Sequence, residues 1–186
     1  MISGTTGQFR PGVRIGIDVG SVRIGVSRTD PDAVLAVPVT TVARPRRGST
    51  PRTDLSELAT IVAEYAPLEL VVGLPVTLDG QEGPAVAAVR DYVAELLAEL
   101  EERHLDVPVR LVDERLSTAV ASRQLRAAGR DTRSGRAVID QAAAVVIVQD
   151  TIDFERATGR APGTVVSHAA PQRTRTAPDR DRDDHS

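Results

Sequence analysis

The order of apolar and polar positions divides the chain into a strand-rich first part and a helix-rich second part. Residues 13–42 contain three short runs rich in Val and Ile, which predict strands at 13–19, 22–28 and 34–42 separated by turn-forming residues. No segment long enough for a helix lies between these runs. We therefore expect the three strands to pair as an antiparallel meander.

After a loop that follows the meander, helical periodicity alternates with short apolar runs. The pattern predicts, in order, a helix at 54–66, a strand at 68–73, a helix at 84–104, a strand at 107–113, and helices at 118–128 and 136–158. Strands that alternate with helices are typical of parallel strands joined by helical crossovers. The predicted fold class is therefore α/β, with a mixed five-stranded sheet (three antiparallel then two parallel strands) and helices on both faces.

Apolar periodicity is confined to the middle of the chain, and this sets the expected domain organisation. We expect a flexible N-terminal extension at 1–12, one folded domain at 13–158 and a disordered tail at 159–186, where prolines and mixed charges cannot form a core. A chain of 186 residues has the usual length for a single domain.

The composition excludes several kinds of chemistry. There is no cysteine, and therefore no thiolate metal site and no cysteine nucleophile. The three histidines, His104, His168 and His185, lie at a helix end and in the tail, which disfavours a histidine-based metal site. Only four aromatic residues occur, which disfavours binding by stacking of bases. No apolar run is long enough to cross a membrane, so a cytoplasmic protein without a membrane partner is expected.

Three carboxylates lie against strongly apolar neighbours, where an uncompensated charge is costly. Asp18 ends the first strand, Glu114 follows the strand that ends at Asp113, and Asp140 lies in the first turns of an apolar helix. Such an all-oxygen set suits Mg²⁺ or Mn²⁺, which can activate water for phosphodiester hydrolysis. Because side chains alternate across a sheet, only one of Asp113 and Glu114 can point as Asp18 does, and the pattern leaves open which.

Each of these features also has a purely structural interpretation. Asp18 could cap its own turn, the pair at 113–114 could be neutralised by Arg115, and Asp140 could be stabilised by the helix dipole. The net charge of −3 does not indicate a uniformly basic nucleic-acid coat, so phosphate binding would need local patches. Two arginine-rich stretches are candidates, one comprising Arg44, Arg46, Arg47 and Arg52 and the other Arg123, Arg126, Arg130, Arg133 and Arg136.

Four segments resemble the bacterial pre-16S rRNA nuclease family, whose members are also described as Holliday-junction-resolvase-like proteins. They are Asp18-Val-Gly-Ser-Val-Arg-Ile-Gly-Val26, Val71-Val-Gly-Leu-Pro-Val-Thr-Leu-Asp-Gly80, Asp113-Glu-Arg-Leu-Ser-Thr118 and Ile139-Asp-Gln-Ala-Ala-Ala144, in the order of the family.

The resemblance implies an RNase H-like fold, a cytoplasmic location and a nuclease that processes the 5′ end of pre-16S rRNA in ribosome biogenesis. It implies that Asp18, Glu114 and Asp140 are catalytic and bind Mg²⁺ or Mn²⁺. The expected partners are precursor rRNA or branched DNA, together with ribosomal particles. The arginines expected to contact nucleic acid are Arg23, Arg115, Arg130, Arg133 and Arg136.

Three alternatives differ in substrate or in chemistry. A Holliday-junction resolvase would use the same site on branched DNA, and both substrates present a phosphate backbone. A ribosome assembly factor would keep the fold without turnover. A sugar-kinase-like phosphotransferase is disfavoured because the chain has one lobe and no second Asp-x-Gly segment.

Overall fold

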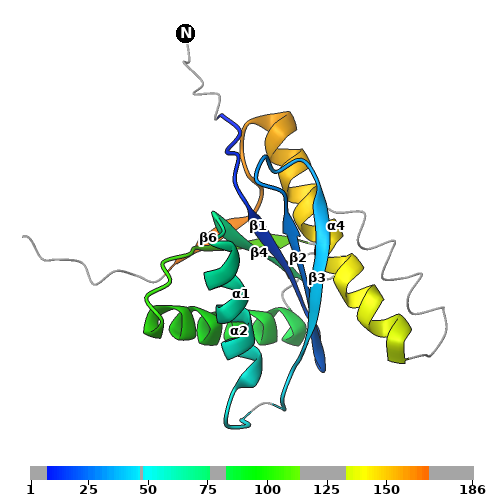
Figure 1. The fold of residues 1–186 in the computed structure, drawn as a ribbon, viewed down its shortest axis with the longest axis vertical. Helices are drawn as coiled ribbons and strands as arrows, with labels where there is room; N and C mark the ends of the chain where they lie inside the picture. Colours follow the sequence, from blue (N-terminus) through cyan, green and yellow to red (C-terminus); the bar gives the residue numbers. More distant parts are fainter. Residues whose placement is uncertain (1–7, 47, 76–82, 114–132, 168–186) are drawn as a thin grey trace, which may run out of the picture.

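The computed structural model describes residues 8–46, 48–75, 83–113 and 133–167, without the side chains of 133–139. Its elements are β1 (Arg14–Val19), β2 (Arg23–Thr29), β3 (Ala36–Ala43), α1 (Thr53–Tyr65), β4 (Glu69–Leu74), α2 (Pro84–Glu102), β5 (Val109–Asp113), α4 (Arg133–Thr158) and β6 (Thr164–Val166). The strands form one sheet in the order β3-β2-β1-β4-β5-β6 (Figure 1).

The sheet begins as the expected meander and continues with parallel strands. β1, β2 and β3 pair antiparallel, whereas β4 pairs parallel with β1 and β5 parallel with β4. Each parallel connection passes through helical chain, because a parallel neighbour cannot be reached through a tight turn. The predicted α/β class and the strand directions are confirmed. The helix expected at 118–128 lies outside the described residues.

The ordered chain extends further at both ends than the pattern predicted. β6 pairs antiparallel with β5, so the sheet has six strands rather than five, and the expected disordered tail was wrong for Thr164–Val166. At the other end, Arg10 lies in the expected flexible extension but forms ion pairs with Glu69 and Glu155. Neither feature was predictable from periodicity, because a three-residue strand and a single ion-paired arginine contain no repeated apolar spacing.

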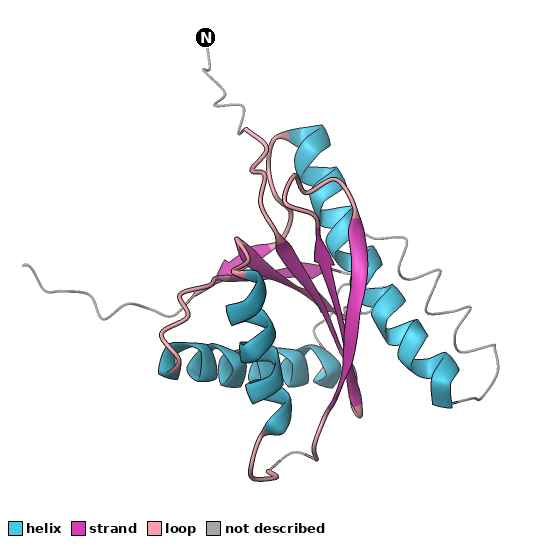
Figure 2. Ribbon diagram, in the orientation of Figure 1, coloured by secondary structure: helices cyan, strands magenta, loops and turns pink. Residues whose placement is uncertain are grey.

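Helices cover both faces of the sheet (Figure 2). α1 and α2 pack on one face, over a large core that includes Ile15 and Ile17 of β1. α4 packs on the other face, where Gly16 would place a Cβ only 2.5 Å from the Ala144 carbonyl oxygen. Alternation along β1 therefore assigns Asp18 to the α4 face, together with Gly16.

The contact between α4 and the sheet is made backbone to backbone. A Cβ on Gly25 of β2 would lie 2.0 Å from the carbonyl oxygen of Asp140, closer than any side chain permits. Ala143 and Ala144 on the helix are fully buried against the same face. The small side chains on the helix and the glycines of the strands together make this close approach possible.

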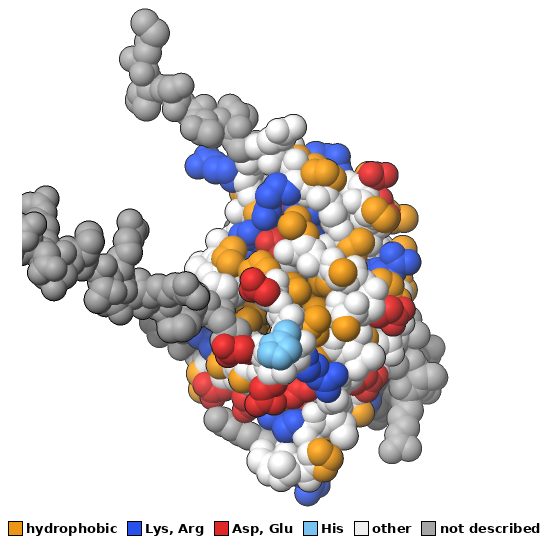
Figure 3. Space-filling view, turned by 60° about the vertical axis from the view of Figure 1, so that its left-hand side comes forward, with side chains coloured by type: hydrophobic (Ala, Val, Ile, Leu, Met, Phe, Trp, Pro, Cys, Tyr) orange, Lys and Arg blue, Asp and Glu red, His pale blue; other side chains and the backbone are white. Residues whose placement is uncertain are grey.

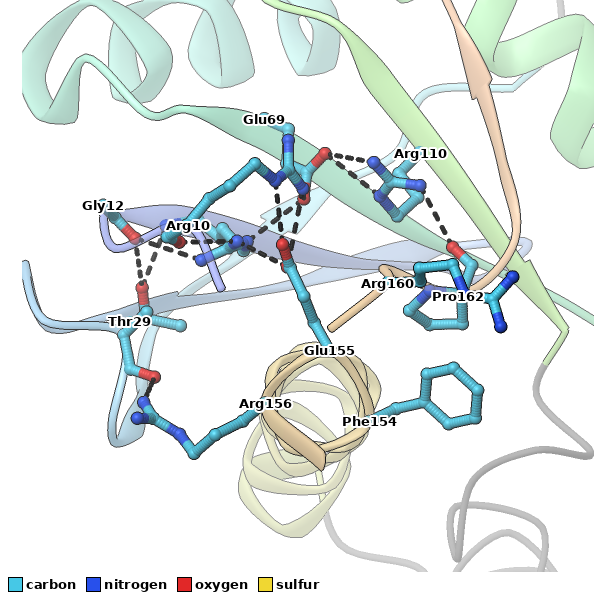
Figure 4. Close-up of polar contacts among 12 residues, drawn as sticks. Arg10, Gly12, Thr29, Glu69, Arg110, Phe154, Glu155, Arg156, Arg160 and Pro162 are labelled. Carbon is cyan, nitrogen blue, oxygen red and sulfur yellow. Dashed lines mark hydrogen bonds and ion pairs between the residues drawn. The ribbon is translucent and has the colours of Figure 1, made fainter. Parts of the chain in front are cut away.

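A buried charge cluster fastens the other end of α4 to the sheet (Figure 4). Arg14, at the start of β1, donates to Glu155 of α4 at 2.6 Å and to Glu69 of β4 at 3.1 Å. Arg110 of β5 donates two further hydrogen bonds to Glu69, at 2.9 and 3.0 Å. Arg14, Glu69 and Glu155 are almost completely buried, and Arg10 closes the cluster on the exposed side.

The arginines decide the ionisation of Glu69. Burial by itself would raise the pKa of Glu69, but the hydrogen bonds and charges of the surrounding arginines, Arg110 first, outweigh it and lower the pKa below its ordinary value of 4.5. The carboxylate therefore stays ionised at neutral pH. Removing one partner of such a buried set leaves an uncompensated charge, so the cluster fixes where α4 lies along β1.

Candidate active site

The first candidate ligand, Asp18, lies near the carboxyl end of β1 on the α4 face. Its side chain is largely buried, and its backbone is paired directly opposite Gly25 of β2. Residues opposite each other in an antiparallel pair are about 4.5–5.5 Å apart between their Cα atoms. Whatever lies over Gly25 is therefore a close neighbour of Asp18.

The residue that lies over Gly25 is Asp140, the second candidate ligand. The missing Cβ of Gly25 leaves room for the Asp140 backbone, so β1, β2 and α4 bring the two aspartates to one place on the sheet. The Asp140 side chain remains partly exposed. The two residues are 122 positions apart in the sequence, and the fold brings their backbones close together.

The position of Asp140 within α4 excludes one structural interpretation of this residue. α4 begins at Arg133 rather than at 136, which places Asp140 about two turns into the helix. The influence of the helix dipole on a carboxylate falls off within the first turn. The dipole therefore does not account for an acidic residue at this position.

Two neighbours that were not singled out from the sequence hold the start of this contact. Gln141 donates from Nε2 to Oγ1 of Thr41 on β3 at 3.1 Å. Thr41 is in turn paired with Gly25 in the ladder between β2 and β3. The sequence does contain one indication of this contact, because a glycine within an apolar strand often marks the close approach of another backbone.

The structure separates the two acidic residues after β5. Leu111 belongs to the core under α1 and α2, whereas Val112 packs on the α4 side. Asp113 pairs with Leu74, which also belongs to the α1 and α2 core. Asp113 therefore points away from the face that carries Asp18.

The third candidate ligand, Glu114, lies outside the described residues, as does Arg115. Across 8–113 and 133–167, apart from the gaps, no group of three or more His, Asp or Glu residues could hold a metal ion. Two carboxylates on one face nevertheless fit a hard divalent cation, which prefers oxygen donors. Two of the three residues expected as ligands thus lie in the described part of the chain, on one face of the sheet.

Arg23 is the arginine that the structure places at the two aspartates. It begins β2, and its Nε donates to Oδ2 of Asp140 at 2.9 Å. Of the other arginines expected to contact nucleic acid, Arg133 and Arg136 have only their backbone described, in α4, and Arg130 lies outside the described residues. The prediction that these arginines bind phosphate stays untested.

Two arginines of the loop before α1 form contacts within the fold. Arg44 donates to the carbonyl oxygen of Gly20 at 2.7 Å, and Arg44 and Arg52 both lie over the ring of Tyr92. Arg52 also pairs with Asp54. Of the four arginines of this loop that were candidates for binding phosphate, Arg44 and Arg52 are therefore engaged within the fold.

One face of the molecule carries charges of both signs. The face shown in Figure 3 intersperses acidic and basic side chains around a histidine and presents no continuous basic patch.

Among the helices that the structure describes, none combines the length and the apolar character that crossing a bilayer requires.

Comparisons with known proteins identify similar sequences and folds. A family model described as "RuvX: Holliday junction resolvase" matches residues 12–154. A protein of Nocardioides sp. is 52% identical over 85% of this chain and 98% of its own length, and one of Streptomyces coelicolor is 49% identical over 84% and 89%. Both carry the name "Putative pre-16S rRNA nuclease".

A solved structure resembles the fold at low sequence identity. The chain matches Thermus thermophilus RuvC in complex with a Holliday junction substrate, with a TM-score of 0.51 and 14% identity, over 81% of this chain and 99% of that one. At this identity the match concerns the fold alone. The expected RNase H-like architecture is confirmed.

Proposed function

Because this chain belongs to the RuvX family of Holliday junction resolvases, we propose that it is a nuclease that hydrolyses phosphodiester bonds in the precursor of 16S rRNA. The observation that carries the proposal is the convergence of Asp18 and Asp140 on one face of the sheet, over Gly25. The backbone contact between α4 and β2 holds these two carboxylates near each other. This arrangement suits the binding of a cation better than it suits a purely structural role. The names of the relatives support RNA as the substrate.

The chemistry of the site follows from its oxygen donors. Asp18, Asp140 and Glu114 would hold Mg²⁺ or Mn²⁺, which when bound supplies positive charge to polarise a water and to stabilise the leaving oxygen. Asp113 is not a ligand in this proposal, because it points to the other face of the sheet. The rigid contact of α4 with β2 keeps the carboxylates in a fixed relative position, which a preorganised site requires.

The chain's own contribution to substrate binding is assigned to arginine. Guanidinium groups pair with phosphate in a planar, two-pronged geometry, which suits a nucleic-acid backbone. Arg23 already lies beside Asp140. The others proposed for this role are Arg115, Arg130, Arg133 and Arg136, acting on precursor rRNA in the cytoplasm, either free or within ribosomal particles.

Branched DNA is the second candidate substrate, favoured by the description of the family model. Both substrates offer phosphates to the same carboxylates, so the site geometry is compatible with either. A direct competition between the substrates separates them.

The test is cleavage of a 16S rRNA precursor bearing its 5′ leader, in parallel with a four-way DNA junction, with Mn²⁺ or Mg²⁺. Asp18→Asn and Asp140→Asn are expected to abolish RNA cleavage while the far-UV circular dichroism stays that of the wild type. Asp113→Asn is the matched control and should retain most of the activity. Cleavage of the junction alone would move the function to DNA, and cleavage of neither substrate would contradict the proposal.

A further inference from the structure

The contact between Arg23 and Asp140 lies at the centre of the candidate site but is only partly buried. Arg23 is two residues before Gly25 in β2, so its side chain is on the same face as Asp18. The side chains of Arg23 and Asp140 are 29% and 27% exposed to solvent. Solvent can therefore reach both charges, and little free energy is lost if they separate.

The buried cluster at the other end of α4 shows what a structural ion pair looks like in this protein. There, Arg14 is completely buried and is shared between two carboxylates. The backbone contact at Gly25 and this cluster already fix α4 on the sheet. The pair between Arg23 and Asp140 is therefore not needed to position the helix.

The pair does place a positive charge where the proposed function requires a metal ion. The guanidinium and a divalent cation both seek the Asp140 carboxylate, and they repel each other when both are present. Within the part of the chain that the structure describes, the Arg23 side chain uses one of its five N–H groups, on Asp140. Once displaced, the guanidinium would be within reach of a phosphate bound at the same site.

We propose that Arg23 neutralises Asp140 in the metal-free protein and moves to a phosphate of the nucleic acid when the ion binds. This inference rests on the proposed function, since it assumes that Asp140 is a metal ligand. Metal binding and nucleic-acid binding are then coupled through one side chain. By thermodynamic linkage, each ligand must increase the affinity for the other by the same factor.

The test uses Arg23→Gln in the full chain, because glutamine removes the charge and keeps a donor of similar reach. The matched control is Arg28→Gln, which removes a charge from the same strand at a site where the guanidinium lies over Tyr65. Calorimetric titration with Mn²⁺, without nucleic acid, should give an affinity for Arg23→Gln that is higher on the order of tenfold than that of the wild type or the control. Arg23→Lys keeps the charge and should behave as the wild type.

A second measurement follows binding of the RNA precursor, with Ca²⁺ as the ion so that cleavage does not interfere. In the wild type, Ca²⁺ should steepen the dependence of log affinity on log salt by about 0.7–0.9, which corresponds to one added phosphate contact. Arg23→Gln should show no such change.

The outcomes distinguish this inference from the proposed function. Unchanged or weaker Mn²⁺ binding by Arg23→Gln, while the wild type binds Mn²⁺, would overturn the exchange and leave the metal site standing. Failure of the wild type to bind Mn²⁺ at all would overturn the metal site and the exchange together. Urea denaturation of Arg23→Gln should match that of the wild type, because the pair is not needed for folding.

Discussion

Replacing Gly25 by alanine tests whether the contact between α4 and β2 builds the candidate site. The new Cβ would lie 2.0 Å from the carbonyl oxygen of Asp140 and 2.4 Å from its carbonyl carbon. Real Cβ atoms essentially never approach another heavy atom closer than 3.0 Å. Because the obstructing atoms belong to a helix backbone, no side chain can rotate out of the way, and α4 must retreat by about 1 Å.

The expected cost follows from the packing that this retreat disrupts. Ala144, Ile147 and Val148 are buried between α4 and the sheet, and a gap of 0.5–1 Å forfeits about a quarter to a half of each dispersion contact. Overpacking typically costs about 1–3 kcal/mol, and we expect Gly25→Ala to be near the upper end of that range. Asp140 moves with the helix, and a misplacement of this size can lower a catalytic rate about 100-fold.

Urea denaturation monitored by circular dichroism measures the first effect, and cleavage of the RNA precursor measures the second. Gly83→Ala, at the N-cap of α2, is the control, because no atom of the described residues lies within 4 Å of its added Cβ. As an N-cap substitution, it should cost less than about 1 kcal/mol and leave cleavage unchanged. If the free energies of unfolding of the two variants agree within about 0.5 kcal/mol, the tight contact does not exist and the argument for the site fails with it.

Three further predictions concern the charges. Glu69→Gln should lower the free energy of unfolding by about 3–5 kcal/mol at neutral pH, because buried arginines lose a carboxylate partner. Since folding lowers the pKa of Glu69, its stabilising effect is complete above the ordinary pKa of 4.5 and is lost as the pH falls below it, so the wild type and Glu69→Gln should converge in acid urea titrations. Glu114→Gln should abolish Mn²⁺-dependent cleavage whereas Asp113→Asn should not, and the reverse ranking would reassign the ligand. Replacing Arg130, Arg133 and Arg136 together by alanine should weaken the dependence of log RNA affinity on log salt by about 0.7–0.9 for each lost phosphate contact. An unchanged dependence would mean that these three residues do not contact the RNA.

Periodicity predicted most of the fold because long elements repeat their apolar spacing several times. β6 was missed because three mostly exposed residues carry no such repetition. The faces of the sheet could not be assigned from the sequence, because alternation relates neighbouring residues without saying which helix covers them. The structure supplies that information, because Leu111 and Val112 pack in different clusters. By alternation, Asp113 then points away from the face that carries Asp18.

The candidate site was predictable in its members but not in its construction. Asp18 and Asp140 were identifiable because each is a charge within an apolar segment. The role of Gly25 was not, since a strand glycine can mark a bulge, a turn or a close approach, and only the position of α4 distinguishes these. The buried cluster was invisible for a related reason, because Arg14 and Glu155 are 141 residues apart and neither has a local signature.

The dependence of the site on α4 has a consequence for the order in which the protein is made. α4 is the last helix that the structure describes, and it supplies both Asp140 and Glu155, which accepts a hydrogen bond from Arg14. During synthesis β1, β2 and β3 leave the ribosome before α4, so the sheet face that carries Asp18 is uncovered and lacks Asp140. A growing chain therefore cannot assemble the two aspartates until residue 140 has left the ribosome, and cannot fix their helix until residue 155 has followed. Under the proposed function, the growing chain therefore stays inactive towards the RNA around it until α4 has packed on the sheet.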